Sequence, residues 1–132
     1  MTNNFSKVKD YLLEMEYTII SEDSKEELVI IENLKSGISN LIIDCEDPIL
    51  VLELHLFDLE KTNEHIFLRF LQMNREIIHG AIAVDETGKK VILRDTLQLE
   101  NLDMNELQGS LNSFEVFLSE NANELISISK NK

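Results

Sequence analysis

Residues 73–99 constrain the fold of this chain more than any other segment. They predict the end of a helix, a short strand over residues 81–84, a tight turn and a partner strand. The turn places Asp85 at its first position and Gly88 at its last, as a type I turn prefers. The partner strand alternates Val91, Leu93 and Leu97 with Arg94 and Thr96. The segment therefore predicts an antiparallel hairpin that follows directly on a helix.

A second strong pattern lies over residues 50–56, where leucine occupies every second position. Val51, Glu53 and His55 stand between the leucines. Successive side chains of a strand point to opposite faces, so this period of two is the period of a strand. Leucine is a good helix former, but seven residues of strict alternation conflict with a helix. We therefore predict a strand whose leucine face packs against the helices.

Apolar residues at helical spacing predict three helices. They cover residues 5–16, residues 62–74 and a stretch of about 20 residues from Asp103, with a fraying tail over residues 127–132. Asn4 is the expected cap of the first helix, and Thr62 or Asn63 that of the second. Asp103 and Glu106 resemble a capping box at the start of the third.

Further strands precede residue 50. We expect a short strand that begins at Ile19, a solvated acidic turn over residues 21–27, and strands over residues 28–33 and 38–45. Gly37 suits the positive φ angle of the turn between the last two. The order is α-β-β-β(-β)-α-β-β-α, without a helix between each pair of strands. Residues 1–132 are therefore expected to form one α+β domain, with a mainly antiparallel sheet and helices on one face.

The charge of the chain limits its expected partners. There are 12 Lys plus Arg against 25 Asp plus Glu, a formal net charge of -13. Such a field repels phosphate backbones and anionic lipid headgroups, so we expect neither nucleic acid nor a membrane surface as a partner. A basic protein segment remains compatible with this charge. The first residues lack the pattern of a signal peptide, and no apolar run is long enough for a bilayer, so we expect a cytoplasmic protein.

The sequence carries no recognisable catalytic motif, and we expect neither enzymatic activity nor a cofactor nor a metal site. Cys45 lies on the apolar side of its strand, which predicts a buried structural thiol. Its acidic neighbours would raise the pKa of that thiol and suppress the thiolate. His55, His65 and His79 are scattered and lack the spacing of zinc ligands. Gly109 in the last helix predicts either a close approach of another element or a tolerated defect.

Apolar residues also occupy the second face of several strands, where a solvated antiparallel sheet should be polar. They are Val29, Ile31, Ile42, Val51, Ile82, Val84 and Ile92. Which parity faces the helices is fixed by the pattern only for residues 50–56. We predict that the second face is a protein-interaction surface, either a dimer interface or a client groove. Its candidate residues are Val29, Ile31, Ile42, Val51, Glu53, His55, Ile92 and Arg94.

Several segments resemble the YbjN domain family, which has the type III secretion chaperone-like (Tir chaperone-like) fold. The resemblance is carried by residues 47–52, 69–74 and 80–85, by Gly88 with residues 91–94, and by residues 97–99. It covers residues 47–118 well and the first 46 residues loosely. These motifs are structural and include no agreed catalytic residue. The resemblance implies a small, acidic, dimeric protein that holds an extended segment of a client along an apolar surface.

These observations together predict a protein-binding, chaperone-like module that forms a homodimer and holds a segment of a protein partner. The alternative is a regulatory or small-ligand sensor domain without catalysis, in which a pocket between helix and sheet accepts a metabolite.

Overall fold

The computed structural model describes residues 3–130. The elements are α1 (Asn4–Glu14), β1 (Thr18–Asp23), β2 (Leu28–Asn33), the 3-10 turn η1 (Leu34–Ser36), β3 (Ile38–Glu46), β4 (Ile49–Asp58), α2 (Glu64–Asn74), β5 (Ala81–Val84), β6 (Lys90–Gln98) and α3 (Met104–Ser129). The six strands form one sheet in the order β1-β2-β3-β4-β6-β5, and every neighbouring pair is antiparallel. The expected α+β class and element order are confirmed, with four strands before α2.

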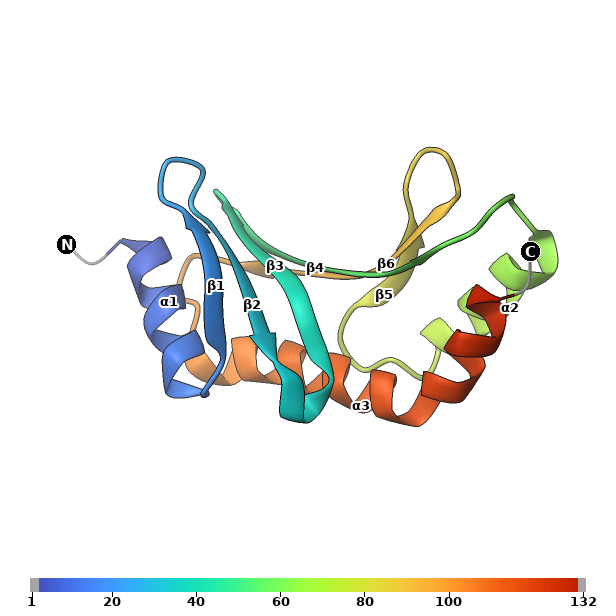
Figure 1. Ribbon diagram of the computed structural model, residues 1–132. Helices are drawn as coiled ribbons and strands as arrows, with labels where there is room; N and C mark the ends of the chain where they lie inside the picture. Colours follow the sequence, from blue (N-terminus) through green and yellow to red (C-terminus); the bar gives the residue numbers. More distant parts are fainter. Residues whose placement is uncertain (1–2, 131–132) are drawn as a thin grey trace.

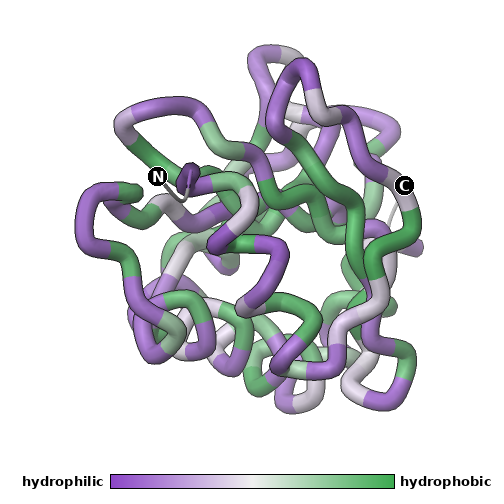
Figure 2. Tube along the Cα trace, turned by 90° about the vertical axis from the view of Figure 1, so that its left-hand side faces the viewer, coloured by the Kyte–Doolittle hydropathy of each residue, from purple (hydrophilic) through white to green (hydrophobic). Residues whose placement is uncertain are grey.

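One face of the sheet is covered by the long helix α3, which runs beneath it, while the opposite face carries no helix (Figure 1). The leucine face of β4 lies against this helix layer, as predicted: Leu50, Leu52 and Leu54 are buried. Phe114 of α3 is fully buried in the same core. Hydrophilic residues lie at the hairpin tips, and hydrophobic and hydrophilic residues alternate along the helices (Figure 2). Burial of one face of each element therefore accounts for the two-layer arrangement.

Side-chain caps set where the helices begin. Asn63 accepts hydrogen bonds from the first amides of α2, and Asp103 forms a full capping box with Glu106 at the start of α3, as predicted. The cap of α1 is Asn3, whose side chain accepts a bond from the Ser6 amide, so the prediction of Asn4 was wrong by one residue. A boundary shift of this size is common when neighbouring residues are both good caps, as two asparagines are.

Two other boundaries differ from expectation. Strand β1 runs to Asp23, through part of the segment expected to be a solvated turn, because pairing with β2 supplies hydrogen-bond partners for this polar stretch. Helix α3 continues to Ser129, where fraying was expected, because Leu125 still packs in the core and holds the last turns. Residues 131–132 of the expected tail lie outside the described part of the chain.

The connection from α2 to β5 brings the backbone close to α3. Gly80 has φ +91°, and a Cβ atom at this position would stand 2.9 Å from the Arg94 carbonyl oxygen and 2.9 Å from the Phe114 ring. Only glycine combines this φ angle with so close an approach. The turn at Gly37 also has a positive φ angle, but the space around it is open.

The outer edge of β5 is covered by a side chain. Asn74, at the end of α2, accepts a hydrogen bond from the Ile82 amide at 2.7 Å and donates one to the Ile82 carbonyl at 3.3 Å. Its amide group therefore binds both polar backbone groups of the central β5 residue, as a neighbouring strand would. This pair of bonds also fixes the end of α2 against the sheet.

Candidate functional site

The face of the sheet opposite α3 is the candidate functional site. Residues directly opposite each other on paired strands share a face, so the registers define its rows. One row runs Leu28, Asp44, Val51 and Thr96, and the next runs Ile30, Ile42, Glu53 and Arg94. We call this surface the open face; it comprises Leu28, Ile30, Ile42, Asp44, Val51, Glu53, His55, Ile92, Arg94 and Thr96, with Ala81 and Ala83 at the β5 end.

The apolar part of the open face is concentrated on β2, β3 and the start of β4. Leu28, Ile30 and Ile42 are half-buried by their neighbours alone, without a helix over them. Val51 is 9% exposed and yet lies outside the main core cluster, which is on the other side of the sheet. Contiguous apolar side chains on a sheet surface mark a site for a partner more often than isolated ones do.

The structure separates the candidate residues into two groups. Six of them share the open face: Ile42, Val51, Glu53, His55, Ile92 and Arg94. Val29 and Ile31 do not, because each is 0% exposed and packs in the core beneath the sheet. Their placement on the second face was wrong, and that of Ile82, which is also buried, was wrong for the same reason.

These residues were misplaced because apolar and polar side chains do not alternate along β2 and β5. Residues 28–31 are all apolar, so the sequence of β2 does not distinguish its two faces. The residues that β2 contributes to the open face are instead Leu28 and Ile30, which the sequence analysis did not single out. The register with β3, where Ile30 stands opposite Ile42, is the signal that identifies them.

Asp44 is a further residue of the open face that the sequence did not predict. It lies between Leu28 and Val51 in the register, and its Oδ1 atom is buried without a hydrogen-bond partner among the described residues. Burial, followed by the nearby carboxyl of Glu46, raises the pKa of Asp44 to about 6, and the charges of Glu26 and Glu53 act in the same direction. The open face therefore contains a carboxylate whose ionised form is poorly compensated.

Two pairs of polar side chains lie on or near the open face. Arg94 Nε donates to Glu53 Oε1 at 3.2 Å in the middle of the sheet, and His55 Nε2 lies 2.8 Å from Asp58 Oδ1 at the end of β4. Both pairs are accessible to water, so each contributes little to stability. The Glu53–Arg94 pair divides the apolar zone on β2 and β3 from Ile92 and the alanines of β5.

Replacing Asp44 with asparagine should stabilise the fold by about 1 kcal/mol at neutral pH. The carboxyl binds its proton near pH 6 in the native state and near 3.8 as a free group, so the native state alone is penalised by the charge above pH 6. The penalty is relieved as the pH falls through 6 toward 4. Urea unfolding of both proteins at pH 7.5 and pH 5 measures this difference. It should shrink at pH 5, and an equal difference at both values would contradict the assignment.

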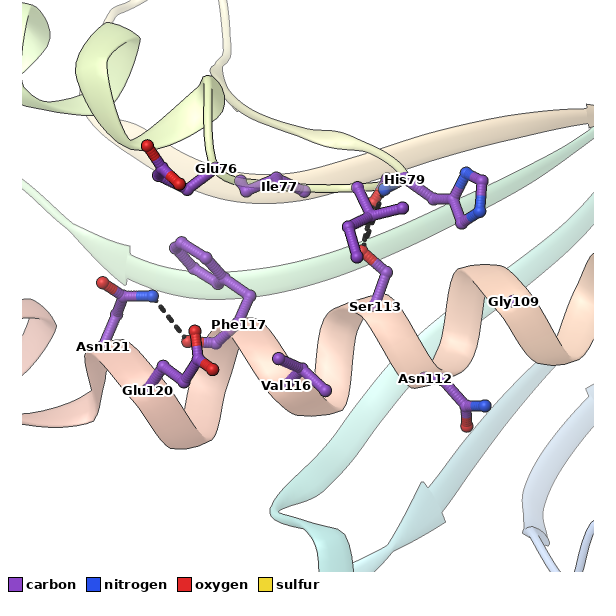
Figure 3. Close-up of a pocket in the computed structure, with 11 residues that line it drawn as sticks. Glu76, Ile77, His79, Gly109, Asn112, Ser113, Val116, Phe117, Glu120 and Asn121 are labelled. Atoms are coloured by element: carbon purple, nitrogen blue, oxygen red, sulfur yellow. Dashed lines mark hydrogen bonds between the residues drawn. The ribbon is translucent and has the colours of Figure 1, made fainter.

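Several clefts lie beside α3, away from the open face, and two of them bear on the function. The first, about 260 Å³, lies between the α2–β5 connection and the middle of α3 (Figure 3). There Ser113 Oγ accepts a bond from the His79 amide at 3.0 Å and donates one to the His79 carbonyl at 2.9 Å. The His79 ring lies 3.5 Å from where a Cβ atom of Gly109 would stand, which is ordinary van der Waals contact. These contacts hold the connection to the helix.

The second cleft, about 530 Å³, lies between the C-terminal half of α3, the turn η1 and the end of β4. Most of its lining is apolar, with Leu56, Phe57 and Leu118 on its walls. It occupies the position between helix and sheet where the sensor alternative places a metabolite. Ionisable side chains do not converge in it, since Lys35 alone among its lining residues carries a charge.

The free cysteine lies in the sheet. Cys45 is buried, and burial, followed by the charges of Glu27 and Asp44, raises the pKa of its thiol to about 12. The prediction that Cys45 is buried and that its acidic neighbours raise the pKa of its thiol is confirmed. Within residues 3–130, no three side chains of His, Cys, Asp or Glu come close enough together to hold a metal ion. No helix in that same range has both the length and the apolar character to cross a bilayer.

Comparisons with known proteins agree with this architecture. A sequence model of the CesT_Tir_1 family matches residues 1–131. YbjN from E. coli has a similar structure, with 10% sequence identity and a TM-score of 0.65, covering 89% of this chain and 90% of that one. The search of curated proteins by sequence found no match.

Two structures of protein complexes are also similar. The HopA1–SchA chaperone–effector complex contains a chain with 14% identity and a TM-score of 0.60, covering 87% of this chain and 91% of that one. The ExsC–ExsE complex contains one with 18% identity and a TM-score of 0.61, covering 90% and 96%. At these identities the likeness establishes a shared fold, and the predicted resemblance to YbjN and the secretion chaperones is confirmed at that level.

Proposed function

Because the chain belongs to the CesT_Tir_1 family, we propose that it is a protein-binding, chaperone-like module without catalysis, which holds a segment of a partner protein on the open face. The observation that carries this proposal is the open face itself. Its apolar side chains lie on a sheet surface that has no helix over it, although the opposite surface is fully packed. The fold shared with chains from chaperone–effector complexes supports a protein, and not a small molecule, as the occupant.

The mechanism would be burial of the partner's apolar side chains against Leu28, Ile30, Ile42 and Val51. Each square ångström of apolar surface removed from water contributes about 25 cal/mol. Ordering a flexible segment opposes much of this gain. A sheet surface that is already formed and rigid limits the ordering cost to the partner. The negative charge of the chain would speed the encounter with a basic segment.

The proposal includes a homodimer that forms through another surface. Leu68 and Leu71 on α2 are 54% and 65% exposed, and Val84 of β5 lines the same shallow pocket as Leu71. Burying these side chains against a second copy would leave the open face free for the partner. We also propose that the protein works in the cytoplasm and does not bind nucleic acid, for which its net charge of -13 is unfavourable.

The experiment is affinity purification of the tagged full chain from its native cell, followed by mass spectrometry. Wild type should retain a stoichiometric protein, and Ile42→Asp should lose at least nine-tenths of it, because the new carboxylate would be buried under the partner. Light scattering should give twice the chain mass for both proteins.

The matched control is Ile78→Asp, since Ile78 is 78% exposed and lies on the α2–β5 connection, away from the open face. It should keep the partner. Equal retention by Ile42→Asp and wild type would refute the open face as the binding surface. A melting temperature that responds to a metabolite, with no protein recovered, would favour the sensor alternative.

A further inference from the structure

The side chains around Asp44 indicate which chemical group of a bound partner segment would contact it. On the open face its register neighbours are Leu28 on β2 and Val51 on β4, both apolar. Its Oδ1 atom is buried and has no donor among the described residues. A desolvated carboxylate oxygen without a hydrogen bond costs free energy that a suitable donor would recover.

The ionised groups nearest Asp44 are carboxylates, and an ionised carboxylate cannot donate a hydrogen bond. Glu46 follows on the same strand and acts on Asp44 through a hydrogen bond between the two carboxyl groups and through its charge. Glu26, in the β1–β2 turn, and Glu53, on β4, act on Asp44 as like charges. The guanidinium of Arg94 is engaged with Glu53 at 3.2 Å. His55, further along β4, is paired with Asp58. Asp44 thus belongs to an apolar patch with an excess of negative charge.

We propose that the segment held on the open face carries a lysine or arginine, whose cationic group binds Asp44 while the flanking apolar side chains cover Leu28, Ile30 and Ile42. This inference rests on the proposed function and adds the chemistry of the occupant. Charge complementarity selects a basic partner over a second copy of this chain, because a second copy would place another chain of net charge -13 against the same carboxylates.

The free energy gained by this contact depends on how much water each charged group loses when the partner binds. An ion pair formed at an interface usually gains little, because both charges must first lose water. One carboxylate oxygen of Asp44, Oδ1, is already shielded from water in the folded protein, so part of the desolvation cost at binding falls on the incoming cation alone. The Asp44 side chain is partly exposed, so the cation can reach its carboxylate, and a charge-assisted hydrogen bond there adds affinity that a neutral side chain does not supply. Guanidinium and ammonium groups both meet this requirement.

The test is selection of a phage-displayed library of random 12-residue peptides on the full chain. Peptides enriched by wild type should carry a basic residue flanked by apolar ones. Selection on Asp44→Asn should lose this preference. The matched control, Glu14→Gln, removes one negative charge from an exposed position of α1 and should keep it.

An enriched peptide is then synthesised with arginine and with citrulline, its neutral isostere. The arginine form should bind wild type about 10- to 100-fold more tightly than the citrulline form, and the ratio should approach one on Asp44→Asn. Between pH 7 and pH 5, the arginine peptide should lose affinity for wild type relative to Asp44→Asn, because protonation removes the charge it binds. Binding to Asp44→Asn at the same two pH values is the reference for pH effects that do not involve Asp44.

The outcomes separate the two proposals. Peptides that compete for the open face, and are lost with Ile42→Asp, but bind as well with citrulline as with arginine would refute the cationic occupant and leave the proposed function intact. An arginine preference that survives in Asp44→Asn would refute the role of Asp44. Enriched peptides that bind Ile42→Asp as tightly as wild type would refute both proposals.

Discussion

Gly80→Ala is expected to lower the free energy of unfolding by about 2–4 kcal/mol. The methyl group would be placed 2.9 Å from the carbonyl oxygen of Arg94 in β6 and 2.9 Å from the ring of Phe114. Neither atom can move freely, because one belongs to a paired strand and the other to a fully buried side chain. The φ angle of +91° adds the strain of a left-handed conformation. Urea unfolding monitored by circular dichroism measures the loss.

Gly37→Ala is the matched control for this prediction. Gly37 has a φ angle of +81°, so alanine meets a similar backbone strain, but no atom lies within 4 Å of the new methyl group. We expect a loss of only about 1 kcal/mol. If both variants lost the same amount, the contact between the α2–β5 connection and α3 would not be tight, and the placement of Gly80 against Phe114 would be wrong.

Ile43→Ala is the second large effect, with an expected loss of about 2–5 kcal/mol. Ile43 is 1% exposed in the core between the sheet and α3. Ile42, its neighbour on β3, points to the open face, and Ile42→Ala should cost about 1 kcal/mol or less because no helix packs over it. Both changes remove the same atoms from adjacent positions of one strand, so chemical denaturation compares the two faces directly. Equal losses would mean that the open face is as tightly packed as the core.

Ile43→Ala should lower the stability more than Ile42→Ala does, but Ile42→Ala should weaken partner binding more than Ile43→Ala does. A mildly destabilised Ile42→Ala protein is expected to bind its partner more weakly, whereas Ile43→Ala that remains folded should bind normally. This reversal distinguishes a binding surface from a merely structural one.

Local patterns were sufficient to predict most of the fold. The alternation over residues 50–56 identified both β4 and the face that packs on the helices, because leucine and polar residues were strictly separated there. The turn from Asp85 to Gly88 and the capping box at Asp103 were also correct, since each depends on residues within a few positions. The strand order, in which β6 pairs with both β4 and β5, depends on long-range pairing and was not predicted from spacing.

The candidate site was harder to predict because it depends on the face to which each side chain points. In β2 both faces are apolar, so Val29 and Ile31 were assigned to the wrong one, and only the register with β3 resolves the choice. Asp44 was missed because its environment comes from three strands and a turn that are separate in sequence. A lone aspartate in an acidic chain gives no signal of its own until these neighbours are known.

The contact of Asn74 with Ile82 has a consequence for how molecules of this protein meet. An exposed edge strand offers unpaired amides and carbonyls that can recruit a strand from another molecule and extend into a fibril. At β5 the Asn74 side chain already binds both groups of the central residue, so a foreign strand would first have to displace it. At the other edge, β1 exposes Glu22 and Asp23, whose charges disfavour stacking of identical chains. Both margins of the sheet therefore carry a feature that disfavours pairing with a strand of another molecule.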